Sequence, residues 1–377
     1  MLSLFGGIAE IMPDLKFKEV QRYLEGLFGP DVKLKKVGGM PSTGEKDKLK
    51  GFGYGEPILI EYELNGAVEK AVLGSARTDG GFGHDFLADR AHGVVLAQET
   101  FNKLPRHIHL LDSGAITRDG RLVSIGEVDN FFIFDKYVGG KEYFRDLERI
   151  KAEGALTDLD RERCRALAGY LAELHAVKKG APELYVRRIR DLVGHGECIM
   201  GLIDSYPNDW AFPYEGALKD IEMKCVDWRW RLRGREARLC VEHGDFHPWN
   251  VLFMDDTGTG FMVLDRSRGE FGEAADDVAA MSINYIFYSL QERNGFDGPF
   301  KELFEIFWRE YLETSGDGEV MTVIQPFYAW RGLVVASPIW YPNLSDDVRR
   351  KLFNFILNVL ADDKFSPSGI AEYLEKT

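Results

Sequence analysis

A short polar segment between two apolar runs is the feature that most constrains this chain. Residues 241–253 read VEHGDFHPWNVLF, so two His, one Asp and one Asn lie close together between strand-like runs. A surface loop needs some polar residues, but it does not need this set at this spacing. A further strand-like run, FMVLD, ends at Asp265 after the turn DDTGTG. This pattern predicts a hairpin that returns the chain to the polar segment.

The order of these polar residues matches what phosphoryl transfer requires. That reaction needs a carboxylate that orients the attacking hydroxyl, and metal ions whose ligands hold them against the phosphates. The protein-kinase catalytic loop places an Asp and an Asn at a fixed interval, and a second Asp follows on the metal. Asp245 precedes Asn250 by the same interval here, and Asp265 follows. A turn that caps its own backbone is the structural alternative, but agreement at three points favours the catalytic interpretation.

With these residues in place, the sequence resembles the aminoglycoside phosphotransferase and choline kinase superfamily, the small-molecule relatives of protein kinases. The motif H-G-D-x-x-x-x-N occupies 243–250, and the run DDVAAM follows Asp265. The resemblance implies an α+β, two-lobed, protein-kinase-like fold with a small β-rich N-terminal lobe and a larger, mainly helical C-terminal lobe. We expect a nucleotide-binding lobe at 1–135, a catalytic and acceptor-binding lobe at 136–377, and a hinge at about 134–140.

The same resemblance assigns roles to individual residues. Asp245 resembles the catalytic base, and His243 belongs to the catalytic loop, which it braces. Asn250 and Asp265 resemble the magnesium ligands, and Asp277 resembles the Asp that fixes the catalytic segment. The implied reaction is Mg²⁺-dependent transfer of the γ-phosphoryl group of ATP or GTP to a hydroxyl of a small molecule.

The nucleotide site is marked less clearly. The run GFGYG lacks the last Gly of G-x-G-x-x-G, but as a glycine-rich loop it could still cover the phosphates through Gly51, Gly53 and Gly55. FDKYVGG resembles the hinge that holds the adenine, here around Asp135 and Tyr137. The third-strand lysine of kinases is missing, since Val72-Leu73-Gly74 stand in its place. Lys70 is too far along the strand, and the candidate replacement cations are Arg77, His84 and Arg90.

The acceptor is not specified by the sequence. The aromatic stretch 325–342 suggests Trp330, Arg331 and Trp340 as contacts, although aromatic residues at helical spacing more often form core. An acidic pocket would imply an aminoglycoside-like polycation, and arginines would imply a sugar or a carboxylated metabolite. Both alternatives stay open.

Bulk properties limit the partners. The net charge of −14 argues against nucleic acid, which needs a basic surface. No apolar run reaches the length of a membrane span, and the start lacks the basic region of a signal peptide. Four scattered cysteines indicate a reducing compartment, so we expect a cytoplasmic protein without a membrane partner. The sequence carries no signal for its oligomeric state.

Two other function classes remain. The missing lysine would suit a pseudokinase that binds a nucleotide or a protein without phosphoryl transfer. The pair His243 and His247 would suit a zinc hydrolase, but no HExxH glutamate accompanies them.

Periodicity predicts the main elements. Asn65-Gly66 indicates a hairpin between 57–64 and 68–76, and short apolar runs predict strands at 107–116 and 131–138. Helices are predicted at 88–104, 161–177, 189–206 and 214–232, and the chain should be mainly helical from 276 on. Asp276 and Asp277 are expected to cap a helix.

Overall fold

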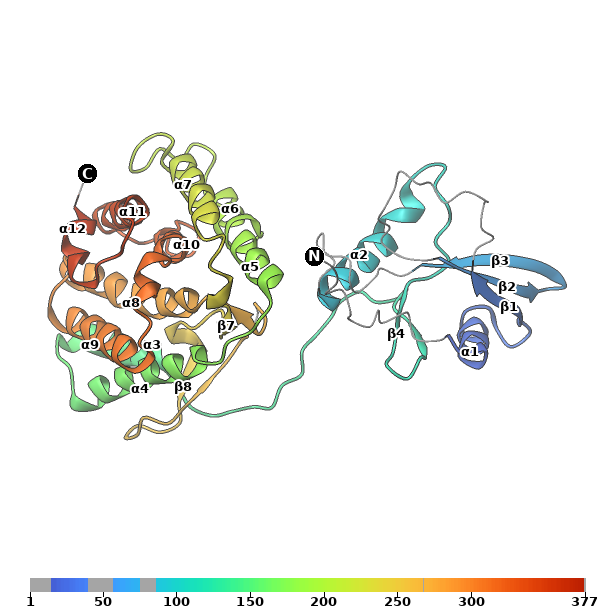
Figure 1. Ribbon diagram of the computed structural model, residues 1–377, viewed down its shortest axis with the longest axis horizontal. Helices are drawn as coiled ribbons and strands as arrows, with labels where there is room; N and C mark the ends of the chain where they lie inside the picture. The colour runs from blue at the N-terminus through green and yellow to red at the C-terminus, as the bar shows by residue number, and fades with distance from the viewer. Residues whose placement is uncertain (1–14, 40–56, 75–85, 267, 376–377) are drawn as a thin grey trace, which may run out of the picture. The chain divides into compact units, whose positions relative to one another are not determined.

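The computed structural model describes residues 15–39, 57–74, 86–266 and 268–375, and Figure 1 shows their helices and strands. The chain forms two compact units, Met1–Asp135 and Lys136–Thr377. In its described part the first unit combines helices with an antiparallel sheet, and the second is mainly helical with short strands. The predicted α+β class is therefore confirmed. None of the helices in the described ranges combines the length and hydropathy of a membrane span.

A hairpin forms in the first unit where the Asn65-Gly66 turn predicted it. β2 (Ile58–Leu64) pairs antiparallel with β3 (Ala67–Leu73), and the two turn residues have φ of +54° and +80°. This left-handed turn matches the twist of the strands that it joins. β1 (Lys33–Gly39) pairs with the other edge of β2.

A small core lies against this sheet. Ile60 and Tyr62 of β2 are buried with Val20 and Leu24 of α1 (Phe17–Phe28). The predicted helix at 88–104 forms as α2 (Leu87–Thr100). The structure describes every residue of this helix, and none of them is buried. The unit also contains η1 (Phe101–Lys103), β4 (Gly114–Ile116) and β5 (Leu122–Ser124).

One strand prediction in this part of the chain holds only in part, and another is wrong. The run 107–116 is irregular except for β4 at its end, and 131–138 contains no strand. The apolar side chains of the second run are exposed, with Phe134 at 93%. Apolar composition alone does not make a strand, because the backbone groups also need a paired neighbour, and the described residues give 131–138 none.

The second unit contains helices where they were predicted, together with short strands. The stretch predicted as one helix at 189–206 instead forms parts of two helices, because the first ends at Gly194 and the second begins at Ile199. Its first half comprises β6 (Lys141–Glu142), α3 (Tyr143–Glu153), α4 (Asp158–His175), α5 (Pro182–Gly194), α6 (Ile199–Asp204), α7 (Ala217–Arg231) and η2 (Glu236–Arg238). Its second half comprises β7 (Cys240–Val241), η3 (Pro248–Asn250), β8 (Val251–Phe253), β9 (Phe261–Val263), β10 (Phe271–Gly272), α8 (Ala274–Arg293), α9 (Gly298–Ser315), η4 (Gly318–Thr322), α10 (Gln325–Ala336), α11 (Asp346–Ala361), η5 (Pro367–Gly369) and α12 (Ile370–Leu374).

Helix α8 is the central element of the second unit. Every residue from Ala274 to Leu290 is buried, and α9 and α10 pack against the helix (Figure 1). A helix buried on all its faces is held in place by its neighbours. Asp276 and Asp277 lie in its first turn rather than at its N-cap, which is Glu273. The cap prediction is therefore wrong, and both carboxylates are free for contacts outside the helix.

Candidate active site

Two short antiparallel ladders bring the polar motif and the segment after Asp265 side by side. β7 pairs with β10, and β8 pairs with β9. The connection 242–250 leaves β7 and enters β8, while 264–270 leaves β9 and enters β10. Backbone hydrogen bonds join the two connections at both ends, from Leu264 N to Asn250 O at 2.9 Å and from Glu242 N to Glu270 O at 3.1 Å.

The glycine of the motif is required where these connections touch. Gly244 has a φ of +84°, which L side chains rarely adopt. A Cβ atom added there would lie 2.9 Å from Cβ of Arg268 on the neighbouring connection. A glycine before Asp245 therefore lets the two connections approach closely.

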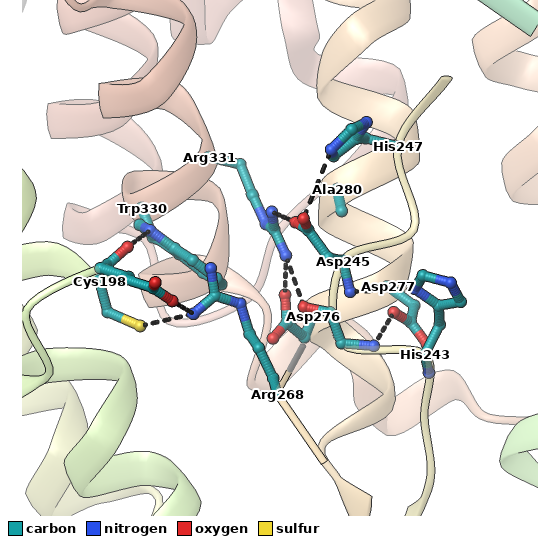
Figure 2. A network of polar contacts seen from close by, with 12 residues as sticks. Cys198, His243, Asp245, His247, Arg268, Asp276, Asp277, Ala280, Trp330 and Arg331 are labelled. Carbon is teal, nitrogen blue, oxygen red and sulfur yellow. Dashed lines mark hydrogen bonds and ion pairs between the residues drawn. The ribbon is translucent and has the colours of Figure 1, made fainter. Parts of the chain in front are cut away.

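Asp277 ties the motif loop to α8. Its Oδ2 accepts the backbone N–H of His243 at 2.7 Å, and its Oδ1 accepts that of Gly244 at 2.8 Å. Figure 2 shows Asp277 beside His243 of the loop. On the side of the helical core, His175 Nε2 lies 3.2 Å from Oδ2 of Asp277. Burial raises the pKa of Asp277, but His175 and the backbone N–H and charge of His243 together lower it below its usual range. A fully buried carboxylate thus holds the backbone on the N-terminal side of Asp245.

Asp245 is held from several directions and stays partly accessible. Arg331 Nη1 donates to its Oδ1 at 2.5 Å, and His247 Nε2 lies 3.4 Å from its Oδ2. Burial raises the pKa of Asp245, but the hydrogen bond from His247 and the charge of Arg331 outweigh it and hold the pKa well below its usual range. The side chain keeps 17% of its surface exposed. A charged carboxylate therefore remains partly accessible on this loop.

Asn250 and Asp265, the residues that resemble metal ligands, lie on the two neighbouring connections. The amide Nδ2 of Asn250 donates to the backbone carbonyl of Asp245 at 3.0 Å, so the nitrogen of this amide faces the loop. The Leu264 hydrogen bond to Asn250 sets the backbone of Asp265 beside it. Asp265 itself is exposed and has a φ of +55°, an uncommon conformation in which the chain turns after β9. Carboxylate and amide oxygens are the donors that Mg²⁺ takes, so this donor set fits the ion.

Each of the two histidines of the motif accepts a hydrogen bond from the backbone of its own loop. His243 Nδ1 accepts the backbone N–H of Asp245 at 3.2 Å, and burial lowers the pKa of His243. His247 Nδ1 accepts the N–H of Trp249 at 3.3 Å. In the described ranges, no group of three or more His, Cys, Asp and Glu side chains is arranged to hold a metal ion. The described residues thus give the zinc alternative no support.

This geometry agrees with the match to a protein family. The model of the phosphotransferase enzyme family, APH, matches residues 123–312 of the 377. The chain belongs to this family. The expected resemblance is therefore confirmed, and the protein is a phosphotransferase.

Solved structures similar to this phosphotransferase are distant in sequence. An ethanolamine kinase of Plasmodium vivax is 13% identical with a TM-score of 0.32, covering 90% of this chain and 80% of its own. An amicoumacin kinase solved with AMP-PNP, Ca²⁺ and Ami is 12% identical with a TM-score of 0.41, covering 94% and 97%. The ADP-bound aminoglycoside phosphotransferase APH(2'')-Ib is 11% identical with a TM-score of 0.29, covering 92% and 98%. No curated protein sequence matches the chain significantly.

The residues predicted to bind the nucleotide are only partly described. Gly51, Gly53, Gly55, Arg77 and His84 lie outside the described residues. Arg90 is half-buried in the first turn of α2. Asp135 and Tyr137 are exposed in the irregular run that joins the units, with Tyr137 at 89%. Lys70 pairs with Glu61 at 3.5 Å on β3.

The three residues predicted to contact the acceptor occupy different environments. Trp330 and Arg331 are buried, and the indole N–H of Trp330 donates to the Glu197 carbonyl at 3.2 Å. Trp340 lies beyond the end of α10 and is 66% exposed. The structure thus brings Arg331 to the motif loop, and Trp340 stays at the surface.

Three further residues were not predicted from the sequence to belong to the site. Asp276 accepts from Arg331 Nη2 at 2.6 Å, and burial raises the pKa of this carboxyl to about 6. The Arg268 guanidinium lies 4.2 Å from the centre of the Trp330 ring, and Nη1 donates to Cys198 Sγ at 3.4 Å (Figure 2). Glu242 is buried, and burial together with Asp276 raises its pKa well above the usual range. The basic run around Arg266 and Arg268 was the one local signal for this part of the site.

Proposed function

We propose that this phosphotransferase transfers the γ-phosphoryl group of ATP or GTP to a hydroxyl group of a small molecule with the help of Mg²⁺. The observation that carries the proposal is the position of Asp245. Its carboxylate is partly accessible and charged, and it lies on the loop that also carries Asn250. That combination supports a group that orients a nucleophile next to a metal site.

Asp245 is the proposed base. Its carboxylate accepts a hydrogen bond from the acceptor hydroxyl and so aims the oxygen at the γ-phosphorus. A bond forms between that oxygen and the phosphorus, the bond from the phosphorus to the β–γ bridging oxygen breaks, and the hydroxyl proton passes to Asp245. The low pKa of Asp245 suits a group whose main task is orientation, because little proton transfer is needed before the phosphoryl group has loosened from its leaving group.

Asn250 and Asp265 are the residues proposed to hold the metal. Bound Mg²⁺ neutralises charge on the phosphate oxygens. Because Asn250 Nδ2 already donates to the loop, the amide oxygen is the atom left for an ion. Asp265 would add a carboxylate from the neighbouring connection, and Asp277 would keep the loop in place by accepting its two N–H groups.

The remaining assignments are also proposals. Nucleotide contacts are proposed for the unit 1–135 and for the run around Asp135 and Tyr137. The acceptor is proposed to approach the accessible side of Asp245, with Trp340 as the exposed aromatic candidate. Arg268, close to this loop and weakly paired with Glu197 at 3.6 Å, favours a sugar or a carboxylated metabolite over a polycation.

The test measures consumption of ATP and GTP with Mg²⁺ against a panel of small hydroxyl compounds, including sugars, amino alcohols and aminoglycosides, with mass detection of phosphorylated products. Asp245→Asn should lower turnover by about 10²–10⁴-fold if general-base assistance is lost. Asp256→Asn is a matched control, because Asp256 is exposed in the β8–β9 turn. Near wild-type turnover in Asp245→Asn would contradict the proposal.

A further inference from the structure

Arg331 of α10 makes a three-way connection at the motif loop. Its Nη1 donates to Asp245 Oδ1 at 2.5 Å, and its Nη2 donates to the Gly244 carbonyl at 3.1 Å and to Asp276 Oδ1 at 2.6 Å. Figure 2 shows the guanidinium between the two carboxylates. One planar group therefore joins the side chain of Asp245, the backbone of its loop and the first turn of α8.

The guanidinium itself has little freedom to move. Arg331 is buried, with 6% of its surface exposed, and its guanidinium carbon lies 3.8 Å from the centre of the Trp330 ring. Trp330 is in turn held by its hydrogen bond to the Glu197 carbonyl. A planar fork with several fixed donors can satisfy this geometry, whereas an ammonium group offers one compact charge.

Arg331 contacts the Asp245 carboxylate from its buried side, so part of the carboxylate stays accessible. The side chain of Arg331 is 7% exposed and that of Asp245 is 17% exposed, so the guanidinium reaches Asp245 from the buried side. His247 and Asn250 approach the other carboxylate oxygen at 3.4 Å each. Since each carboxylate oxygen can accept more than one hydrogen bond, Oδ1 can accept a hydroxyl while it remains bonded to Arg331.

We propose that Arg331 is a positioning residue for phosphoryl transfer, which fixes the Asp245 carboxylate in the orientation that receives the acceptor hydroxyl. The inference rests on the proposed function. Among the described residues, removal of Arg331 would leave the Asp245 carboxylate the two longer contacts on Oδ2 and would remove the ion pair of Asp276. Misplacing a reacting group by about 1 Å can cost on the order of 10²-fold in rate.

The experiment uses the full-length protein with MgATP or MgGTP, with water as the acceptor and then with any hydroxyl compound that the panel identifies. We expect Arg331→Gln to lower kcat by about 10- to 100-fold and to leave KM for the nucleotide within about threefold. Arg331→Lys, which keeps the charge and is the variant to use if Arg331→Gln does not fold, should give an intermediate kcat.

A double-variant comparison separates positioning from general stability. In an Asp245→Asn background, Arg331→Gln should change kcat by less than about threefold, because the carboxylate through which Arg331 acts is already absent. Arg349→Gln is the matched control. Arg349 is also a buried arginine, but it donates to the carbonyls of Ala336 and Tyr341, away from the loop, so its kcat should stay near wild type.

The possible outcomes are distinct. Wild-type kcat in Arg331→Gln or Arg331→Lys would overturn this inference and leave the proposed function standing. The same holds if Arg331→Gln lowers kcat by its full factor in the Asp245→Asn background as well. A wild-type protein that transfers no phosphoryl group from either nucleotide overturns the proposed function and this inference with it.

Discussion

The Asp277 carboxylate accepts the backbone N–H of Gly244 at 2.8 Å, although the two residues lie 33 positions apart in the sequence. A second oxygen of the same carboxylate accepts the N–H of His243. The buried helix α8 thereby fixes the path of the loop that carries Asp245. The geometry of the candidate site thus depends on the helical core as well as on the motif.

Replacing Asp277 tests this link. Asp277→Asn keeps one acceptor oxygen but turns a donor toward the loop, which leaves a buried N–H group unpaired at a cost of about 1–3 kcal/mol in the free energy of unfolding. Turnover should fall by up to about 10²-fold as the loop shifts. Asp255→Asn is the control, because Asp255 also accepts two backbone N–H groups, from Thr257 and Gly258, but in an exposed turn. Equal losses of stability in the two variants, measured by chemical unfolding, would argue against the link.

Gly244 provides a second test of the loop. Gly244→Ala should lower the free energy of unfolding by about 1–2 kcal/mol for the left-handed backbone alone, and the close Arg268 side chain should add to this. Gly180→Ala is the control, since a Cβ at Gly180 meets no atom within 4 Å. Denaturant midpoints measured under the same conditions give the comparison. An unchanged midpoint in Gly244→Ala would show that the loop does not need a glycine.

Arg238 is predicted to matter for stability. It donates to the buried Glu273 at 2.7 Å and to Asp317 at 2.8 Å, so Arg238→Gln leaves a buried carboxylate without its cation. We expect a loss of about 3–5 kcal/mol in the free energy of unfolding. Arg231→Gln removes an ion pair with Asp363 that is exposed on both sides, and should cost less than about 1 kcal/mol. Similar denaturant midpoints for the two variants would contradict this difference.

The buried His243 predicts how stability depends on pH. Burial lowers the pKa of His243 in the folded protein, so below the ordinary histidine pKa of about 6.5 the unfolded chain binds more protons. Stability should therefore fall as the pH decreases through that value. His243→Asn should flatten this dependence between about pH 5 and 7, whereas replacing the exposed His195 should not. Thermal unfolding midpoints across this range provide the measurement, and parallel curves for wild type and His243→Asn would contradict the prediction.

Local sequence patterns identified the motif and predicted most helices and strands, but they could not predict contacts between residues far apart in the sequence. Asp245 and Asn250 belong to one short motif, and two-residue turn chemistry placed the β2–β3 hairpin. The contact between Arg331 and Asp245 spans 86 positions and depends on α10 packing against α8. No interval or periodicity in the sequence carries that information.

The failed predictions have a related cause. The run 131–138 has strand-like composition, but a strand exists only with a paired neighbour. Asp276 and Asp277 carry the residue type of a helix cap, yet Glu273 takes that position. The two aspartates instead accept from Arg331 and from the motif loop. In both cases the partner, rather than the residue type, decides the structure.

The most direct measurement is thermal unfolding with ATP or GTP, each with and without Mg²⁺. A ligand at about 100 times its dissociation constant should add about 2.7 kcal/mol to the stability of the folded protein. We predict a Mg²⁺-dependent increase in the unfolding temperature that Asp265→Asn removes and that the exposed control Asp256→Asn retains. No increase with either nucleotide, or an increase that Asp265→Asn leaves intact, would contradict a Mg²⁺–nucleotide site built on Asn250 and Asp265.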